Sequence, residues 1–148
     1  AHRTELVSSI DIFPTALAAA GARQPKIEVP GLNLLPHMKD GSAIPRDSIF
    51  GESFAHDVAD IEDPEASLLF RWCIQGEWKL LLTYDGEVNR YKTTHPREEK
   101  RPQLFNLEQD PEENENLAGD NPKIVAKMAK LIENWWPVNE RKVLTRYD

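Results

Sequence analysis

The sequence predicts an α+β fold, with a roughly four-stranded antiparallel sheet packed against a C-terminal helix and an N-terminal helix and irregular arm in front. Three observations predict it. From residue 48 onward, apolar and polar side chains alternate with a period of two, as in half-buried strands. A single glycine, Gly76, separates two such segments, which is typical of a β-hairpin. Near the C-terminus, apolar side chains recur at helical spacing.

The first expected element is a short helix over residues 7–21. Ser8 and Ser9 can cap its start, and Pro14 suits a first helical turn. Gly21 then supplies a C-terminal stop.

Residues 22–47 contain four prolines and two glycines, a composition that excludes a long helix or a central strand. We therefore expect an irregular connector, docked onto a surface by its three leucines. The expected domain organisation is an N-terminal arm over residues 1–47 and a sheet with its helix over residues 48–148.

Residues 48–56 are expected to form the first strand. The alternation places Phe50, Glu52, Phe54 and His56 on one face of it.

The next two strands, over residues 67–75 and 77–84, form the hairpin around Gly76. Their apolar faces are Leu68, Phe70, Trp72 and Ile74 in one strand, and Trp78, Leu80, Leu82 and Tyr84 in the other.

Residues 103–107 predict a short fourth strand, which is broken by Asp110-Pro111. Asn121 caps and Pro122 opens the last helix, which runs to about Trp136. Its apolar stripe consists of Ile124, Val125, Met128, Leu131, Ile132 and Trp135.

Length, charge and cysteine content restrict the possible functions. The 148 residues suffice for one domain, and a net charge of −7 provides no basic footprint for nucleic acid. No apolar run approaches the roughly 18 residues of a membrane span. The one cysteine, Cys73, excludes an internal disulfide and a multi-cysteine zinc site, and its mid-strand position predicts a buried structural residue. Ala1 to Glu5 form neither a signal peptide nor a natural methionine start, so we expect a piece of a longer protein.

Neither the acidic nor the histidine residues predict a metal site. The acidic run has neither the ligand spacing nor the glycine of a calcium loop, so a solvated loop is expected. The run consists of Asp57, Asp60, Glu62, Asp63 and Glu65. The four histidines are scattered and include no helical i, i+4 pair.

The four tryptophans raise the hypothesis of a sugar-stacking platform. Trp72, Trp78 and Trp135 lie on stripes that core packing already explains, so a core role is expected for them, and Trp136 is the least explained. The sequence contains no glycine-rich phosphate loop, nucleophile elbow or Ser-His-Asp arrangement. The residues alone therefore indicate an α+β module without chemistry of its own.

Three segments, in order and spacing, resemble the C-terminal part of the type I sulfatases of the alkaline-phosphatase superfamily. The first is Ser8–Thr15, with its Asp-x-x-Pro-Thr motif, followed by the Gly-x-x-Leu-Leu-Pro element Gly31–Pro36. The second is Arg71–Leu80, similar to a hairpin that turns at a glycine into Trp-Lys-Leu. The third is Leu104–Glu113 followed by Asn116–Ala118, similar to a Leu-Tyr-Asp-Leu, Asp-Pro-x-Glu, Asn-Leu-Ala signature, with phenylalanine where tyrosine is commoner.

The resemblance implies a parent protein that is a sulfuric ester hydrolase. Sulfatases use a hydrated formylglycine as nucleophile and a calcium ion that polarises the sulfate. The motifs for both lie in a large N-terminal domain, and Cys73–Glu77 does not match the Cys/Ser-x-Pro/Ala-x-Arg modification motif. By resemblance, this chain carries no catalytic residue, no metal ligand and no cofactor.

The resemblance also implies that the chain packs beside the missing N-terminal sulfatase domain and forms one wall of the substrate cleft. Glu52 and His56 are the candidate substrate-binding residues, and the parent's substrate would be a sulfated carbohydrate or an aryl sulfate. An exported parent, periplasmic or extracellular, would agree with the family. The alternative is a free-standing, non-catalytic binding or interaction module with the same fold, which the coding sequence upstream of Ala1 would distinguish.

Overall fold

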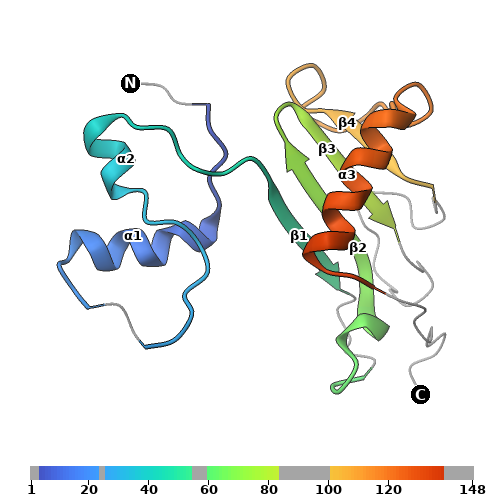
Figure 1. Ribbon diagram of the computed structural model, residues 1–148. Coiled ribbons are helices and arrows are strands. Elements are labelled where there is room, and N and C mark those ends of the chain that lie inside the picture. The colour runs from blue at the N-terminus through green and yellow to red at the C-terminus, as the bar shows by residue number, and fades with distance from the viewer. Residues whose placement is uncertain (1–3, 24–25, 55–59, 84–100, 139–148) are drawn as a thin grey trace. The chain divides into compact units, whose positions relative to one another are not determined.

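The computed structural model describes residues 4–23, 26–54, 60–83 and 101–138 (Figure 1). The chain divides into two compact units, residues 1–49 and residues 50–148. The domain boundary expected between residues 47 and 48 stays a prediction.

The first unit contains two helices. A short 3₁₀-helix, Ser9–Asp11, leads directly into α1, Ile12–Ala19, which confirms the helix expected over residues 7–21. Gly21 follows it with φ of +64°, a left-handed conformation that glycine adopts readily.

The connector is less irregular than the sequence predicts, because it contains α2, Leu35–Asp40. Pro36 lies in the first turn of this helix, where its missing N–H costs no hydrogen bond. Gly41 ends it with φ of +74°. The proline and glycine that argued against a long helix therefore begin and end a short one.

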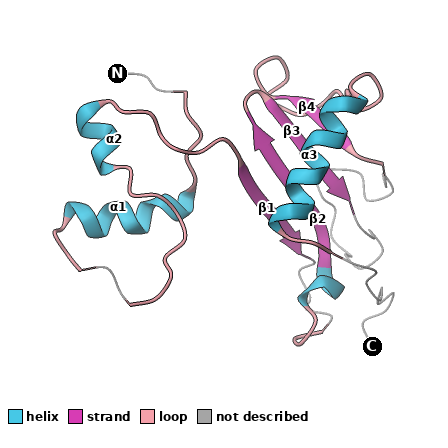
Figure 2. Ribbon diagram, in the orientation of Figure 1, coloured by secondary structure: helices cyan, strands magenta, loops and turns pink. Residues whose placement is uncertain are grey.

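The second unit is the predicted four-stranded antiparallel sheet with a helix across one face (Figure 2). The strands lie side by side in chain order and are β1 Ile49–Phe54, β2 Leu68–Gln75, β3 Trp78–Thr83 and β4 Gln103–Asn106. The helix, α3, spans Pro122–Trp135. A 3₁₀-helix, Pro64–Ser67, closes the segment expected to be an acidic loop. The expected strand ends at His56 and Tyr84 lie outside the described residues.

The main core lies between α3 and the sheet. Cys73, Leu80 and Leu104 are cross-strand neighbours in β2, β3 and β4, and all three are fully buried. Met128 and Ile132 of α3 pack onto them. The buried structural cysteine that the sequence predicts is confirmed.

The two apolar faces of the hairpin lie on opposite sides of the sheet. Cys73 of β2 pairs with Leu80 beneath α3, so Trp72 and its partner Leu81 point to the other side. There, Trp72 packs against a second buried cluster that contains Leu81. A Cβ atom added at Gly51 of β1 would lie 2.2 Å from the ring of Trp72, so only glycine leaves room for that ring.

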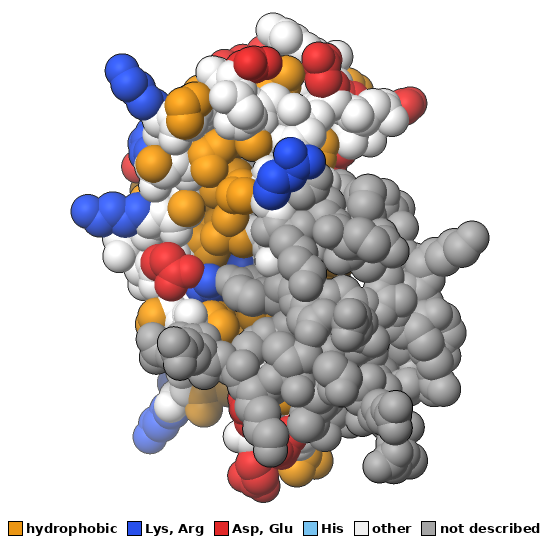
Figure 3. All heavy atoms as spheres, turned by 90° about the vertical axis from the view of Figure 1, so that its right-hand side faces the viewer, with side chains coloured by type: hydrophobic (Ala, Val, Ile, Leu, Met, Phe, Trp, Pro, Cys, Tyr) orange, Lys and Arg blue, Asp and Glu red, His pale blue; other side chains and the backbone are white. Residues whose placement is uncertain are grey.

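Not all apolar side chains of the described residues are buried. On the side shown in Figure 3, hydrophobic side chains gather in a band bordered by projecting lysine and arginine side chains. In the first unit, Ile12 and Phe13 of α1 are 69% and 53% exposed. Among the described helices, none combines the length and the apolar character that crossing a membrane requires.

Candidate functional site

In the first unit, the carboxylate of Asp11 connects three separate segments. Its two oxygens accept the backbone N–H groups of Ser8 and Leu32, each at 2.7 Å. Arg46 donates to both oxygens as well, at 2.5 and 2.6 Å. The side chain of Asp11 is fully buried, so this bidentate pair is shielded from water. The hydrogen bonds from Arg46, then those from the two backbone amides, hold the pKa of Asp11 far below its usual range.

The threonine of the Asp-x-x-Pro-Thr motif binds the same loop. The Thr15 hydroxyl accepts the backbone N–H of Leu34 at 2.9 Å and donates to the carbonyl of Leu32 at 3.3 Å. Gly31, with φ of +97°, brings the backbone so close to Ile10 that an added Cβ would lie 2.4 Å from its carbonyl oxygen. The polar groups of this motif are therefore used to hold α1 and the following loop together.

In the second unit, the hairpin and the Asp-Pro-x-Glu signature are joined by an ion pair. Lys79 of β3 donates to both carboxylate oxygens of Glu113, at 2.6 and 2.7 Å. Asp110 accepts the backbone N–H of Glu115 at 2.8 Å within the same turn. Both acidic side chains of the signature thus bind groups of the fold.

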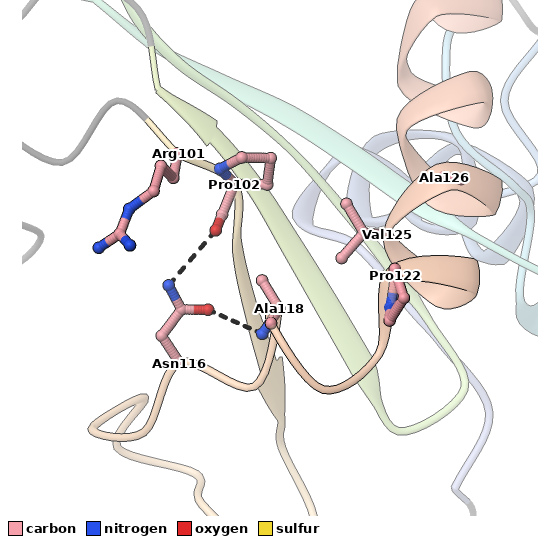
Figure 4. Close-up of a pocket in the computed structure, with 8 residues that line it drawn as sticks. Arg101, Pro102, Asn116, Ala118, Pro122, Val125 and Ala126 are labelled. Atoms are coloured by element: carbon pink, nitrogen blue, oxygen red, sulfur yellow. Dashed lines mark hydrogen bonds between the residues drawn. The ribbon is translucent and has the colours of Figure 1, made fainter.

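Asn116 of the Asn-Leu-Ala signature fixes the connection from β4 to α3 (Figure 4). Its Oδ1 accepts the backbone N–H groups of Leu104 and Ala118, both at 3.0 Å, and its Nδ2 donates to the carbonyl of Pro102 at 3.3 Å. The residues beside it line a pocket of about 630 Å³, with Val125 on its α3 side. The pocket wall is mainly apolar, and the amide of Asn116 is engaged by the backbone.

The guanidinium of Arg71 lies under the C-terminal end of α3. Its side chain is 1% exposed, and it donates to the backbone carbonyl of Trp136 and to the carboxylate of Glu133. A cation at this end of a helix satisfies a free carbonyl and interacts favourably with the helix dipole. Arg71 therefore fixes the position of the chain where α3 ends.

Four aromatic rings meet at that point, and we call them the aromatic patch: Phe50, Phe54, Trp135 and Trp136. Phe50 stacks on Trp135 with 5.3 Å between the ring centroids and 15° between the planes. Trp135 meets Trp136 edge to face at 6.1 Å, and Trp136 lies 6.1 Å from Phe54. Phe54 and Trp135 are each 40% exposed. The expected core role of Trp135 is therefore met only in part, because much of the residue remains exposed to solvent.

Glu52 is exposed and lies on β1 between Phe50 and Phe54, so the alternation of the strand places it on the face of the aromatic patch. His56 lies outside the described residues. The structure thus gives Glu52 aromatic neighbours on its strand, and a joint role with His56 stays a prediction.

Among the described residues, no group of three or more His, Cys, Asp or Glu side chains could hold a metal ion. The described part of the acidic run is a local turn, in which Asp60 accepts the backbone N–H of Glu62 at 2.9 Å. The described members of the acidic run, from Asp60 onward, therefore do not form a donor set for calcium.

The sequence does not predict the structural roles of two arginine side chains. Arg46 lies 35 residues after its partner Asp11, and the sequence contains no local pattern that joins the two. Arg71 is the one charged residue in the apolar strand β2. A cation in such a strand is buried only when it is paired, so its position was the sequence signal for a buried, paired guanidinium.

Comparison with known proteins gives one consistent result. No protein-family model matches the chain. Over 132 residues the chain is 30% identical to Arylsulfatase K of Xenopus laevis, covering 87% of this chain and 22% of that protein. Over 137 residues it is 32% identical to Arylsulfatase A of Bos taurus, covering 87% of this chain and 25% of that protein.

The fold is also similar to that of a solved structure, Ps i-CgsB in complex with k-i-k-neocarrahexaose. The TM-score is 0.57 at 21% identity, covering 97% of this chain and 27% of that one. The chain thus spans about a quarter of the length of the proteins that it matches.

Proposed function

This chain is homologous to one part of the sulfatases of the alkaline-phosphatase superfamily, and we propose that it is the C-terminal subdomain of a longer sulfatase. In this role it completes the fold of a sulfuric ester hydrolase and is not catalytic alone. A formylglycine nucleophile and a calcium ion would be supplied by the N-terminal domain of that longer protein.

One observation carries the proposal. The polar side chains of the segments that resemble sulfatase motifs are engaged in holding the chain's own backbone together. Asp11 and Thr15 bind the loop at residues 31–34, and Asn116 binds β4 to the connection that leads to α3. Polar side chains that are occupied by hydrogen bonds to the backbone support a structural role for this chain rather than a catalytic one.

The exposed apolar residues of the first unit support the proposal that this unit binds a partner domain. Val7, Ile10, Ile12 and Phe13 are all about half exposed or more, and they follow one another within seven residues. Apolar side chains clustered in this way mark interaction surfaces. We assign this surface to the N-terminal sulfatase domain.

The second part of the proposal concerns the substrate cleft. Glu52 and His56 of the first strand of the sheet would line one wall of it, where the carboxylate suits the hydroxyl groups of a sugar and the imidazole suits the edge of a sulfate. The substrate class would be a sulfated carbohydrate or an aryl sulfate. The exposure of Glu52 supports this role.

The coding sequence upstream of Ala1 and the intact protein made from it test the proposal. We expect that sequence to encode a Cys/Ser-x-Pro/Ala-x-Arg motif, and peptide mass spectrometry of the natural protein to find that Cys or Ser converted to formylglycine. A reading frame that begins shortly before Ala1 without such a motif would instead favour a free-standing binding module with this fold.

A further inference from the structure

The aromatic patch is a continuous row of rings at the surface of the second unit. The row runs from Phe54 through Trp136 and Trp135 to Phe50, with centroid distances of 6.1, 6.1 and 5.3 Å. It is built from both the edge strand β1 and the end of α3. Two segments separated by about 80 residues of chain thus converge on one surface.

The patch is held rigidly from beneath. Arg71, which is almost fully buried, donates to the backbone carbonyl of Trp136 and to Glu133 one turn earlier. The backbone N–H of Trp136 donates to the carbonyl of Ile132 at 3.0 Å, and Ile132 is part of the main core. The backbone of Trp136 is therefore anchored to the core without a ligand.

The exposure of the rings distinguishes the patch from core packing. Phe54 of β1 and Trp135 of α3 each leave 40% of their surface to solvent, whereas the large apolar residues of β2, β3 and β4 are all buried or partly buried. Exposed aromatic rings that are fixed in place offer large contact area at little cost in side-chain entropy. The apolar C–H face of a pyranose ring is a ligand that such rings accept.

The negative charge of Glu52 on the face of the aromatic patch restricts which kind of sugar can bind there. Glu52 stands between Phe50 and Phe54 on β1, about 7 Å along the strand from each at roughly 3.3 Å per residue. A carboxylate accepts hydrogen bonds from sugar hydroxyl groups and repels a sulfate ester. An unsulfated pyranose fits this combination, and a sulfated one does not.

We propose that the aromatic patch with Glu52 is a carbohydrate subsite that stacks an unsulfated pyranose residue of a sulfated saccharide. This inference rests on the proposed function and deepens it, because it separates the sugar unit that is held from the unit that carries the sulfate. The subsite then selects saccharides with alternating or incomplete sulfation.

Binding of two matched probes to this chain tests the inference. The probes are κ-neocarrahexaose and the same hexasaccharide after chemical desulfation, titrated while tryptophan fluorescence and saturation-transfer NMR are recorded. We expect the desulfated probe to bind more tightly, and Trp136→Ala to weaken it roughly tenfold, the loss expected when one stacked ring is removed. Phe54→Leu should weaken it as well. Trp78→Phe, at the opposite end of β3, is the matched control and should leave binding unchanged.

Glu52→Gln supplies the second readout. Removal of the negative charge should raise the affinity for the sulfated probe and leave the affinity for the desulfated probe within about twofold. Circular dichroism of each variant shows that the fold is intact.

Three results would overturn the inference: no binding of the desulfated probe at millimolar concentration, binding that Trp136→Ala leaves unchanged, or a self-association that Trp136→Ala abolishes without any saccharide binding. The last result would identify a protein interface. None of these outcomes bears on the upstream formylglycine motif, so failure of the subsite and failure of the proposed function are distinguishable.

Discussion

Arg46 donates hydrogen bonds from both terminal nitrogens of its guanidinium to the two carboxylate oxygens of Asp11, at 2.5 and 2.6 Å. The two residues are separated by 35 positions, and the carboxylate is fully buried. The pair therefore joins the end of the first unit to the residue that precedes α1. Opening it would leave one charge without its partner in a shielded position, which is strongly destabilising.

The pair predicts a specific dependence of stability on pH. The folded pKa of Asp11 lies far below the value of about 3.9 in unfolded chains, so the unfolded state binds more protons as the pH falls through this range. The stabilisation is complete above about pH 5 and is lost progressively as the pH falls below 4. Hydrogen exchange at the amide of Leu32, which donates to Asp11, reports it directly.

Asp11→Asn should lower the free energy of unfolding of the first unit by roughly 3–5 kcal/mol and remove this part of its acid dependence. Asp40→Asn is the matched control, because the carboxylate of Asp40 is exposed and accepts only local hydrogen bonds from Ser42. Equal acid sensitivity in wild type and Asp11→Asn would contradict the assigned role of Asp11.

Gly31→Ala and Gly21→Ala form a matched pair of substitutions. Both glycines have positive φ, so an alanine costs about 1–2 kcal/mol at either position. Only at Gly31 would the new Cβ also lie 2.4 Å from a backbone carbonyl oxygen, whereas Gly21 has open space around it. We expect Gly31→Ala to destabilise the first unit clearly more than Gly21→Ala in hydrogen exchange of α1. Equal effects would show that the close approach to Ile10 relaxes at no cost.

The sheet and its helix were predictable because each of their signals is local. Alternation specifies a strand that has one buried face, Gly76 specifies the turn, and Asn121-Pro122 with the apolar stripe specifies α3. The structure confirms all of these. The sequence does not predict the short helix α2, because proline and glycine interrupt long helices, although Pro36 at a helix start and Gly41 at a helix end favour a short one.

Long-range relationships were not predictable from these signals. Periodicity predicts which residues of a strand share a face, but it does not predict which of the two faces the helix covers. In the structure, the apolar stripe of β2 that contains Trp72 lies on the face away from α3. The partnership of Arg71 with the end of α3 spans more than 60 residues and depends on the folded arrangement. The same holds for the aromatic patch, of which the sequence indicated only that Trp136 had no obvious core role.

Arg71→Met tests the anchor beneath α3, since methionine keeps the apolar stem and removes the guanidinium. Loss of its charged hydrogen bonds should lower the free energy of unfolding by roughly 1–3 kcal/mol and speed exchange of the Trp136 amide. Lys130→Met, at an exposed position of the same helix, should change stability by less than about 0.5 kcal/mol. Unchanged exchange at Trp136 would remove Arg71 from the role of helix anchor.

Glu52→Gln and His56→Ala in the longer sulfatase test the proposed cleft wall. His56→Ala should mainly raise KM on a sulfated saccharide, whereas Glu52→Gln should lower KM for the more highly sulfated saccharides, because it removes a charge that repels sulfate. Both should leave kcat on a small aryl sulfate unchanged, because the formylglycine chemistry remains. Glu62→Gln, an exposed acid of the neighbouring turn, serves as control. Unaltered kinetics on every sulfated saccharide that the longer protein accepts would exclude both residues from the cleft.

Hydrolysis of an aryl sulfate in the presence of calcium tests most directly whether this chain is a non-catalytic part of a sulfatase. The measurement compares the 148-residue chain, the longer protein encoded with its upstream sequence, and that protein with the formylglycine precursor residue changed to alanine. We predict turnover for the longer protein only, and its loss in the alanine variant. Turnover above background by the 148-residue chain alone, in a preparation free of host sulfatases, would contradict the proposal.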